Sequence, residues 1–240
     1  MNHIFTFNNF IREKFSETNP HGGEFNYGNL SKEDIEKVKL YIEHLKKITQ
    51  ENNIKLLLSP DTGISMDGIM VNGYFDDIKR ILACSLGKDI SQWLPILVHE
   101  SCHMDQYLEQ IPEWLENAGV DNIGSMYYID KWLNGDDNVD MKLVDREIET
   151  SMAVELDNEK RSVEKTKEWG FDKVINLDEY VQNANSYVLF YLWMRKNRRW
   201  YTIGKEPYNN KIIISKMSNS FDYDYTKLPE DIEKLYDKYL

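Results

Sequence analysis

Two histidines and a glutamate lie close together near the middle of the chain, in the run LVHESCHMDQY over residues 97–107. His99, Glu100 and His103 form the pattern H-E-x-x-H, which places both imidazoles one turn apart on a helix. Imidazoles at this spacing can bind one metal ion, and the carboxylate can act as a base beside it. A surface or core histidine pair is the alternative. Gln106 shares the histidine face while apolar residues lie opposite, which favours the metal site.

A catalytic zinc site needs a third protein ligand and an open position for water. A histidine six residues after the second one is missing, because that position is Glu109. The other histidines, His3, His21 and His44, lie in N-terminal segments whose spacing supports no metal site. A carboxylate further along the chain is therefore the better candidate.

The helix predicted over 141–169 carries two such carboxylates. Glu155 and Glu159 project into its core-facing arc, where a charge is costly unless a cation or donors satisfy it. Salt bridges to Lys160 or Arg161 are the alternative, and spacing leaves open which glutamate binds a metal. Four other glutamates lie outside the arc and are expected to be solvated: Glu147, Glu149, Glu164 and Glu168.

These motifs resemble those of the zincin metallopeptidases of the gluzincin type, in which H-E-x-x-H is followed on a later helix by E-x-x-x-D or a near variant. The resemblance implies zinc as the cofactor, His99, His103 and Glu155 as its ligands, and Glu159 as hydrogen-bond partner of a ligand histidine. The chain has Glu where the family has Asp at 159, so the two glutamates could exchange roles. The run from residue 79 to this helix also resembles small metallopeptidase-like proteins of bacteria and phages.

The resemblance implies a zinc peptidase that acts on a peptide or protein substrate. Zinc would lower the pKa of its bound water, and Glu100 would move the proton to the leaving nitrogen. Tyr187 or Tyr191 could donate a hydrogen bond to the oxyanion, with core packing as the alternative. The strand predicted over 79–86 would be the edge that pairs with an extended substrate.

Two other functions use the same residues. One is a non-catalytic zinc-containing binding or regulatory module, such as a toxin–antitoxin or phage-encoded partner. The presence of Glu100 argues against it, because a purely structural site needs no base. The other is a zinc hydrolase of a non-peptide amide. Two histidines and a carboxylate also suit iron or manganese.

Composition limits the class of protein. The chain has 240 residues, 41% of them hydrophobic, and a formal net charge of −12, which is typical of a globular protein and unfavourable for nucleic-acid binding. Two cysteines are too few for a disulfide scaffold and suit a reducing compartment. With no apparent signal peptide or membrane span, we expect a cytoplasmic protein without a membrane or nucleic-acid partner. The oligomeric state stays open.

The pattern of elements predicts an α+β fold, mainly helical, with a small sheet before the H-E-x-x-H helix. The resemblance implies that this is a zincin-like domain. We expect one domain over 1–240, with an irregular segment over 1–30 and a loop-rich segment over 201–240. Ser31 is predicted to cap a helix that runs to Glu51. Short strands are predicted over 54–58, 69–71 and 79–86. A helix capped by Asp89 or Ser91 is predicted to run through Trp93 to about Gln110, and further helices are predicted over 141–169, 178–199 and 229–239.

Three weaker signals favour plain structural roles. Cys102 is expected to be a small buried neighbour of His103. An acidic loop is expected to be solvated and contains Asp136, Asp137 and Asp140. A basic cluster suits the end of a helix, with a site for an acidic partner as the alternative; it contains Arg195, Lys196, Arg198 and Arg199.

Overall fold

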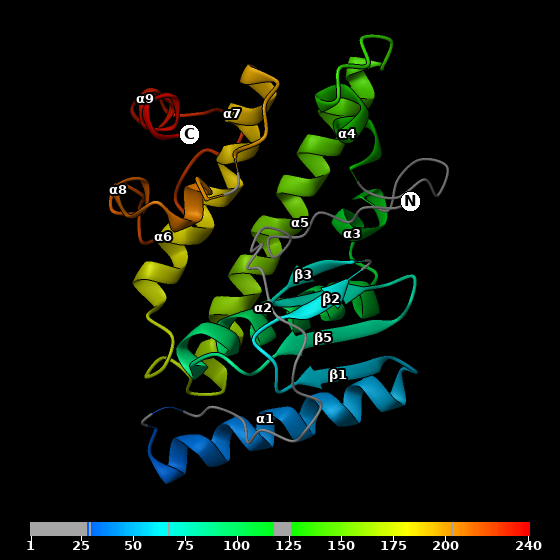
Figure 1. The fold of residues 1–240 in the computed structure, drawn as a ribbon, viewed down its shortest axis with the longest axis vertical. Coiled ribbons are helices and arrows are strands. Elements are labelled where there is room, and N and C mark those ends of the chain that lie inside the picture. Colours follow the sequence, from blue (N-terminus) through cyan, green and yellow to red (C-terminus); the bar gives the residue numbers. More distant parts are fainter. Residues whose placement is uncertain (1–27, 29, 67, 118–125, 203) are drawn as a thin grey trace. The chain divides into compact units, whose positions relative to one another are not determined.

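The architecture was obtained as a computed structural model, which describes residue 28 and residues 30–66, 68–117, 126–202 and 204–240. It is mainly helical with a small sheet, so the predicted α+β class is confirmed (Figure 1). Most of the irregular segment expected over 1–30, with His3 and His21, lies outside the described residues.

The described chain divides into two compact units. The sheet unit contains residues 28–108 and 161–176, and the helical unit contains residues 109–160 and 177–240. Helix α5 (Met141–Glu168) is continuous and contributes residues to both units. The expectation of one domain over the whole chain stays a prediction.

In the part of the chain that the structure describes, the sheet unit is built around a three-stranded sheet in the order β1-β5-β4. β5 (Ile81–Ser85) pairs in parallel with β1 (Lys55–Ser59) and antiparallel with β4 (Gly73–Asp76). The predicted strand over 79–86 is thus the central strand. Its expected role as the substrate-binding edge is wrong, because both of its edges already carry backbone hydrogen bonds.

A two-stranded hairpin and two helices cover the sheet. The hairpin consists of β2 (Ile64–Met66) and β3 (Ile69–Val71), and Ile64 packs in one cluster with Tyr74 and Ala83. Side chains alternate along β4, so Gly73 and Phe75 lie on the opposite face of the sheet from Tyr74. That opposite face meets α2 (Ile90–Glu109), where the Phe75 and Tyr107 rings lie 5.5 Å apart.

Helix α1 (Lys32–Glu51) contacts β1 and runs beside it in Figure 1. The predicted cap is confirmed, because the Ser31 side chain accepts a hydrogen bond from the Asp34 N–H at 3.1 Å. Strands β2 and β4 were not predicted. Both are short and lie next to turns, and β4 starts with a glycine, which is disfavoured in strands.

Apart from the first part of α5, the described residues of the helical unit form seven short elements. They are α3 (Pro112–Asn117), α4 (Tyr127–Leu133), α6 (Leu177–Val188), α7 (Phe190–Asn197), the 3₁₀ turn η2 (Pro207–Asn209), α8 (Lys211–Ile214) and α9 (Glu230–Tyr239). The single helix predicted over 178–199 is divided at Leu189. There the hydrogen-bond pattern of the backbone changes. The Leu189 N–H donates to the Asn185 carbonyl, four residues back as in an α-helix, whereas the Leu192 N–H donates to the Leu189 carbonyl, three residues back as in a 3₁₀ turn.

Candidate metal centre

The H-E-x-x-H residues lie on α2, in the middle of a helix that is buried on both sides. His99 and His103 are each only 3% exposed, and their ring centroids lie 4.8 Å apart. His103 Nδ1 is 2.9 Å from the Gln106 amide oxygen. That oxygen can only accept, so in the tautomer that pairs with it Nδ1 is the donor and Nε2 keeps the lone pair that a metal needs.

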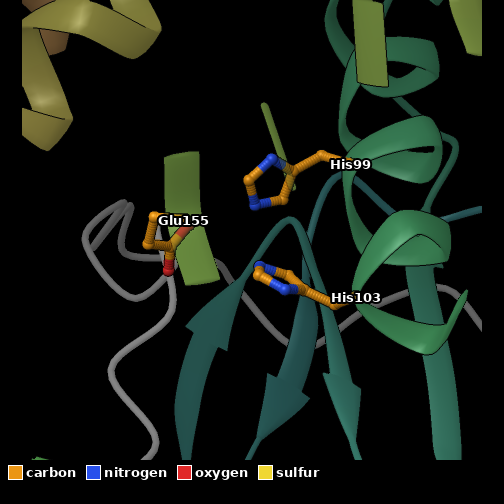
Figure 2. Close-up of side chains that lie close together, drawn as sticks. All are labelled: His99, His103 and Glu155. Carbon is orange, nitrogen blue, oxygen red and sulfur yellow. The ribbon is translucent and has the colours of Figure 1, made fainter. Parts of the chain in front are cut away.

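Glu155 on α5 supplies a third donor to the same place. Ligand atoms of His99, His103 and Glu155 all lie within 4.8 Å of one another, and all three residues are buried. Figure 2 shows the two imidazoles side by side on one helix, with the Glu155 carboxylate facing them from another. This buried group could bind a metal ion.

The donor set fits a divalent transition metal. Two imidazoles and one carboxylate are the ligands found in one class of zinc sites, with the fourth position taken by water. Donor atoms around a tetrahedral zinc lie about 3.3 Å apart, so shifts of at most about 1.5 Å would bring these donors to the metal. The donor types do not separate zinc from iron or manganese.

Glu159 follows Glu155 by one turn of α5 and is 1% exposed. Both glutamates are therefore buried, as their positions on the helix predict. The group of close donor atoms contains Glu155 and not Glu159. This grouping favours Glu155 as the third ligand. The role of Glu159 as hydrogen-bond partner of a ligand histidine stays a prediction.

Glu100 is fully buried, and one of its oxygens, Oε2, accepts a hydrogen bond from the Phe75 N–H at 3.0 Å. The close approach of β4 to α2 depends on Gly73. A Cβ at this position would lie 2.7 Å from Ile96 Cγ2 and 2.9 Å from the Ala83 carbonyl oxygen. Strand β4 thus holds the carboxylate through its backbone, a partner that sequence reasoning missed because the contact joins distant segments.

Tyr187 on α6 and Tyr191 on α7 lie in the helical unit, as Glu155 does. Both tyrosines are 1% exposed, and their hydroxyl oxygens are 3.0 Å apart. Burial raises the pKa of Tyr191, and the negative charge of Glu155 raises it further. The pKa of Tyr187 is raised by burial, by Tyr191 and by Glu155. Both phenols therefore stay protonated and can donate.

The basic cluster is tied to acidic side chains of the same unit. Arg195 pairs with Asp145, Lys196 with Glu233, and Arg198 with Asp137. Arg199 lies over the Trp193 ring, 4.9 Å from its centroid. The structural role of this cluster is therefore favoured over a site for an acidic partner.

The expected roles of Cys102 and Glu147 can also be compared with the structure. Cys102 is fully buried, and burial raises the pKa of its thiol to about 11, which fits an inert packing role. The expectation that Glu147 is solvated is wrong, because it is buried and accepts hydrogen bonds from the N–H groups of Tyr128 and Ile129. These N–H groups belong to the first turn of α4, where backbone donors have no partner within the helix. The residue spacing of α5 does not indicate that α4 lies beside Glu147.

Comparison with protein-family models, curated proteins and solved structures finds no match to this chain. Among the described residues, none of the helices has the length and apolar character that a membrane crossing requires.

Proposed function

We propose that this protein is a zinc-dependent peptidase, in which His99, His103 and Glu155 hold the metal and Glu100 is the general base. The observation that carries this proposal is the close grouping of the three buried ligand atoms, within 4.8 Å of one another. Glu100 follows His99 directly in the same helical turn. Its side chain is thereby placed beside the ligands rather than among them.

The chemistry supplied by a zinc ion at such a site is the acidification of a bound water and the polarisation of a carbonyl oxygen. In this proposal Glu100 accepts the proton of the attacking water and delivers it to the leaving nitrogen. The Phe75 N–H orients Oε2, and we assign the proton transfer to Oε1. Since the carboxylate is fully buried, its orientation is held without competition from bulk water.

The proposed substrate is an extended peptide. Of the three described strands in the main sheet, β4 is an outer strand, and it contacts the proposed base through Phe75. Outer strands can add one further strand through backbone hydrogen bonds. In the proposal, β4 replaces the central strand β5 as the element that lines the substrate site. Tyr187 is the proposed donor to the oxyanion.

The burial of the site favours a second candidate, a non-catalytic metal-binding module. Structural zinc sites are closed by four protein ligands, and Glu159 is a buried carboxylate one turn from Glu155. The two candidates differ in what Glu100 does. A module needs no base, whereas a peptidase depends on one.

The test combines metal analysis with hydrolysis of a fluorogenic, internally quenched peptide library. We expect one zinc per chain and peptide hydrolysis in the wild type, metal without hydrolysis in Glu100→Gln, and neither in His103→Ala. Removal of a general base typically lowers the rate about 10²- to 10⁴-fold. Glu109→Gln, a change at an exposed position of the same helix, is the matched control.

Bound zinc with no hydrolysis by the wild type would favour the module. A protein that takes up no zinc even when zinc is added would contradict both candidates.

A further inference from the structure

Lys165, near the end of α5, joins that helix to α2. Its ammonium group lies 3.2 Å from Ser101 Oγ and forms an ion pair with the Asp105 carboxylate. All three side chains belong to the sheet unit. Both charged side chains are partly buried, so this ion pair is less screened by water than a surface pair.

The contact continues into the core of the unit through Ser101. The Ser101 hydroxyl donates to the Val98 carbonyl at 2.7 Å and lies 2.6 Å from the hydroxyl of the fully buried Tyr41. Because a hydroxyl has one hydrogen and two lone pairs, Ser101 can accept from both Tyr41 and Lys165. The one hydrogen and both lone pairs of the Ser101 hydroxyl are therefore used in hydrogen bonds. These bonds join α1, α2 and α5.

Ser101 and Asp105 lie two residues after His99 and His103, respectively. At 100° per residue the two pairs are on different faces of α2. Lys165 follows Glu155 by ten residues on one continuous helix, which corresponds to about 15 Å along its axis. A rotation or sliding of α2 against this end of α5 would break the Lys165 contacts with Ser101 and Asp105.

We propose that Lys165 is a positioning residue for the metal centre. Its contacts with Ser101 and Asp105 hold α2 against α5 so that Glu155 can complete the ligand set of His99 and His103. This inference rests on the metal binding in the proposed function and makes no use of peptidase activity. It predicts that Lys165 affects zinc affinity through Glu155.

The test is the zinc dissociation constant, measured by competition with a chromogenic chelator. We expect Lys165→Met to weaken zinc binding about tenfold, as changes beside metal ligands commonly do. Lys165→Arg, which keeps the charge and can still donate to Asp105, should recover most of the affinity. Lys167→Met removes the same charge at an exposed position of the same helix and should leave the affinity unchanged.

A double-mutant cycle separates positioning from general loss of structure. In the Glu155→Ala background, Lys165→Met should change zinc affinity by less than about twofold, because the ligand through which it acts is gone. An equal loss in both backgrounds would contradict the inference. If Lys165→Met does not fold, Asp105→Asn removes the ion pair with little change of shape and should show the same dependence on Glu155.

The two proposals fail in different ways. Zinc binding by the wild type with unchanged affinity in Lys165→Met and Asp105→Asn overturns the role of Lys165 alone. No zinc binding by the wild type overturns the proposed function, and the positioning role with it.

Discussion

The carboxylate of Glu100 accepts a hydrogen bond from the Phe75 N–H at 3.0 Å, which links the middle of α2 to the outer strand β4. A buried carboxylate needs such donors, since an ionised group without them is strongly disfavoured in the core. The link also sets where the carboxylate points. The proposed base is thus oriented by strand backbone, and the spacing between strand and helix becomes part of the site.

Gly73→Ala should disturb this spacing. The added Cβ would lie 2.9 Å from the Ala83 carbonyl oxygen, a backbone atom that cannot rotate away. We expect the free energy of unfolding to fall by about 1–3 kcal/mol, as for other overpacked sites, and peptide hydrolysis to fall with it. Urea unfolding measures the first effect. Lys55→Ala, at an exposed position of β1, is the control and should change stability by less than about 0.5 kcal/mol.

Glu155→Gln and Glu159→Gln should differ in their effect on zinc affinity. Loss of a ligand is expected to weaken binding by more than about 100-fold, and loss of a partner of a ligand by about 10- to 100-fold. Competition with a chromogenic chelator measures both values. Glu149→Gln, at an exposed position of the same helix, should bind zinc as the wild type does. A larger loss in Glu159→Gln than in Glu155→Gln would reverse the two roles.

Tyr187→Phe tests the proposed oxyanion donor. We expect kcat to fall about 10²-fold while bound zinc stays at the wild-type level, since loss of one such donor acts on the transition state. The control is Tyr236→Phe, which removes another fully buried hydroxyl, one that donates to the Ser186 carbonyl at 2.8 Å. An equal fall of kcat in both variants would show that Tyr187 acts through packing.

Glu147 should make stability depend on pH. Burial raises the pKa of its carboxyl from 4.5 to about 7, against the opposing effect of the Ile129 and Tyr128 N–H groups. Because the folded protein binds this proton more tightly than the unfolded chain, the contribution to stability is full below pH 4.5. It is then lost as the pH rises through 7.

The measurement is urea unfolding of the wild type and Glu147→Gln at pH 5 and pH 8. The glutamine keeps an oxygen that can accept from the start of α4 and carries no titrating proton. The wild type should therefore lose more stability than the variant between the two pH values. Equal losses would place the pKa of Glu147 near its ordinary value.

Patterns within single helices were predictable from the sequence. The helix period brings His99 and His103 onto one face of α2, and the same period predicts that Glu155 and Glu159 point into the core. The cap at Ser31 depends on residues three positions apart and was predicted for the same reason.

The class of the fold was predictable too, because long helical periods and a few short apolar runs already define an α+β pattern. The outer position of β4, the central position of β5 and the capping of α4 by Glu147 were not. Each depends on a partner from a distant segment. A short strand or a single glutamate carries too little local pattern to indicate that partner.

The sequence by itself therefore determined which residues could bind a metal, since helix geometry places neighbours three and four positions apart whatever surrounds them. Only the tertiary structure decided which of the two buried glutamates meets the histidines, and which backbone N–H orients Glu100. These contacts depend on how separate segments pack against one another. Packing is a property of the whole chain, so it cannot be predicted from the spacing of residues within one segment.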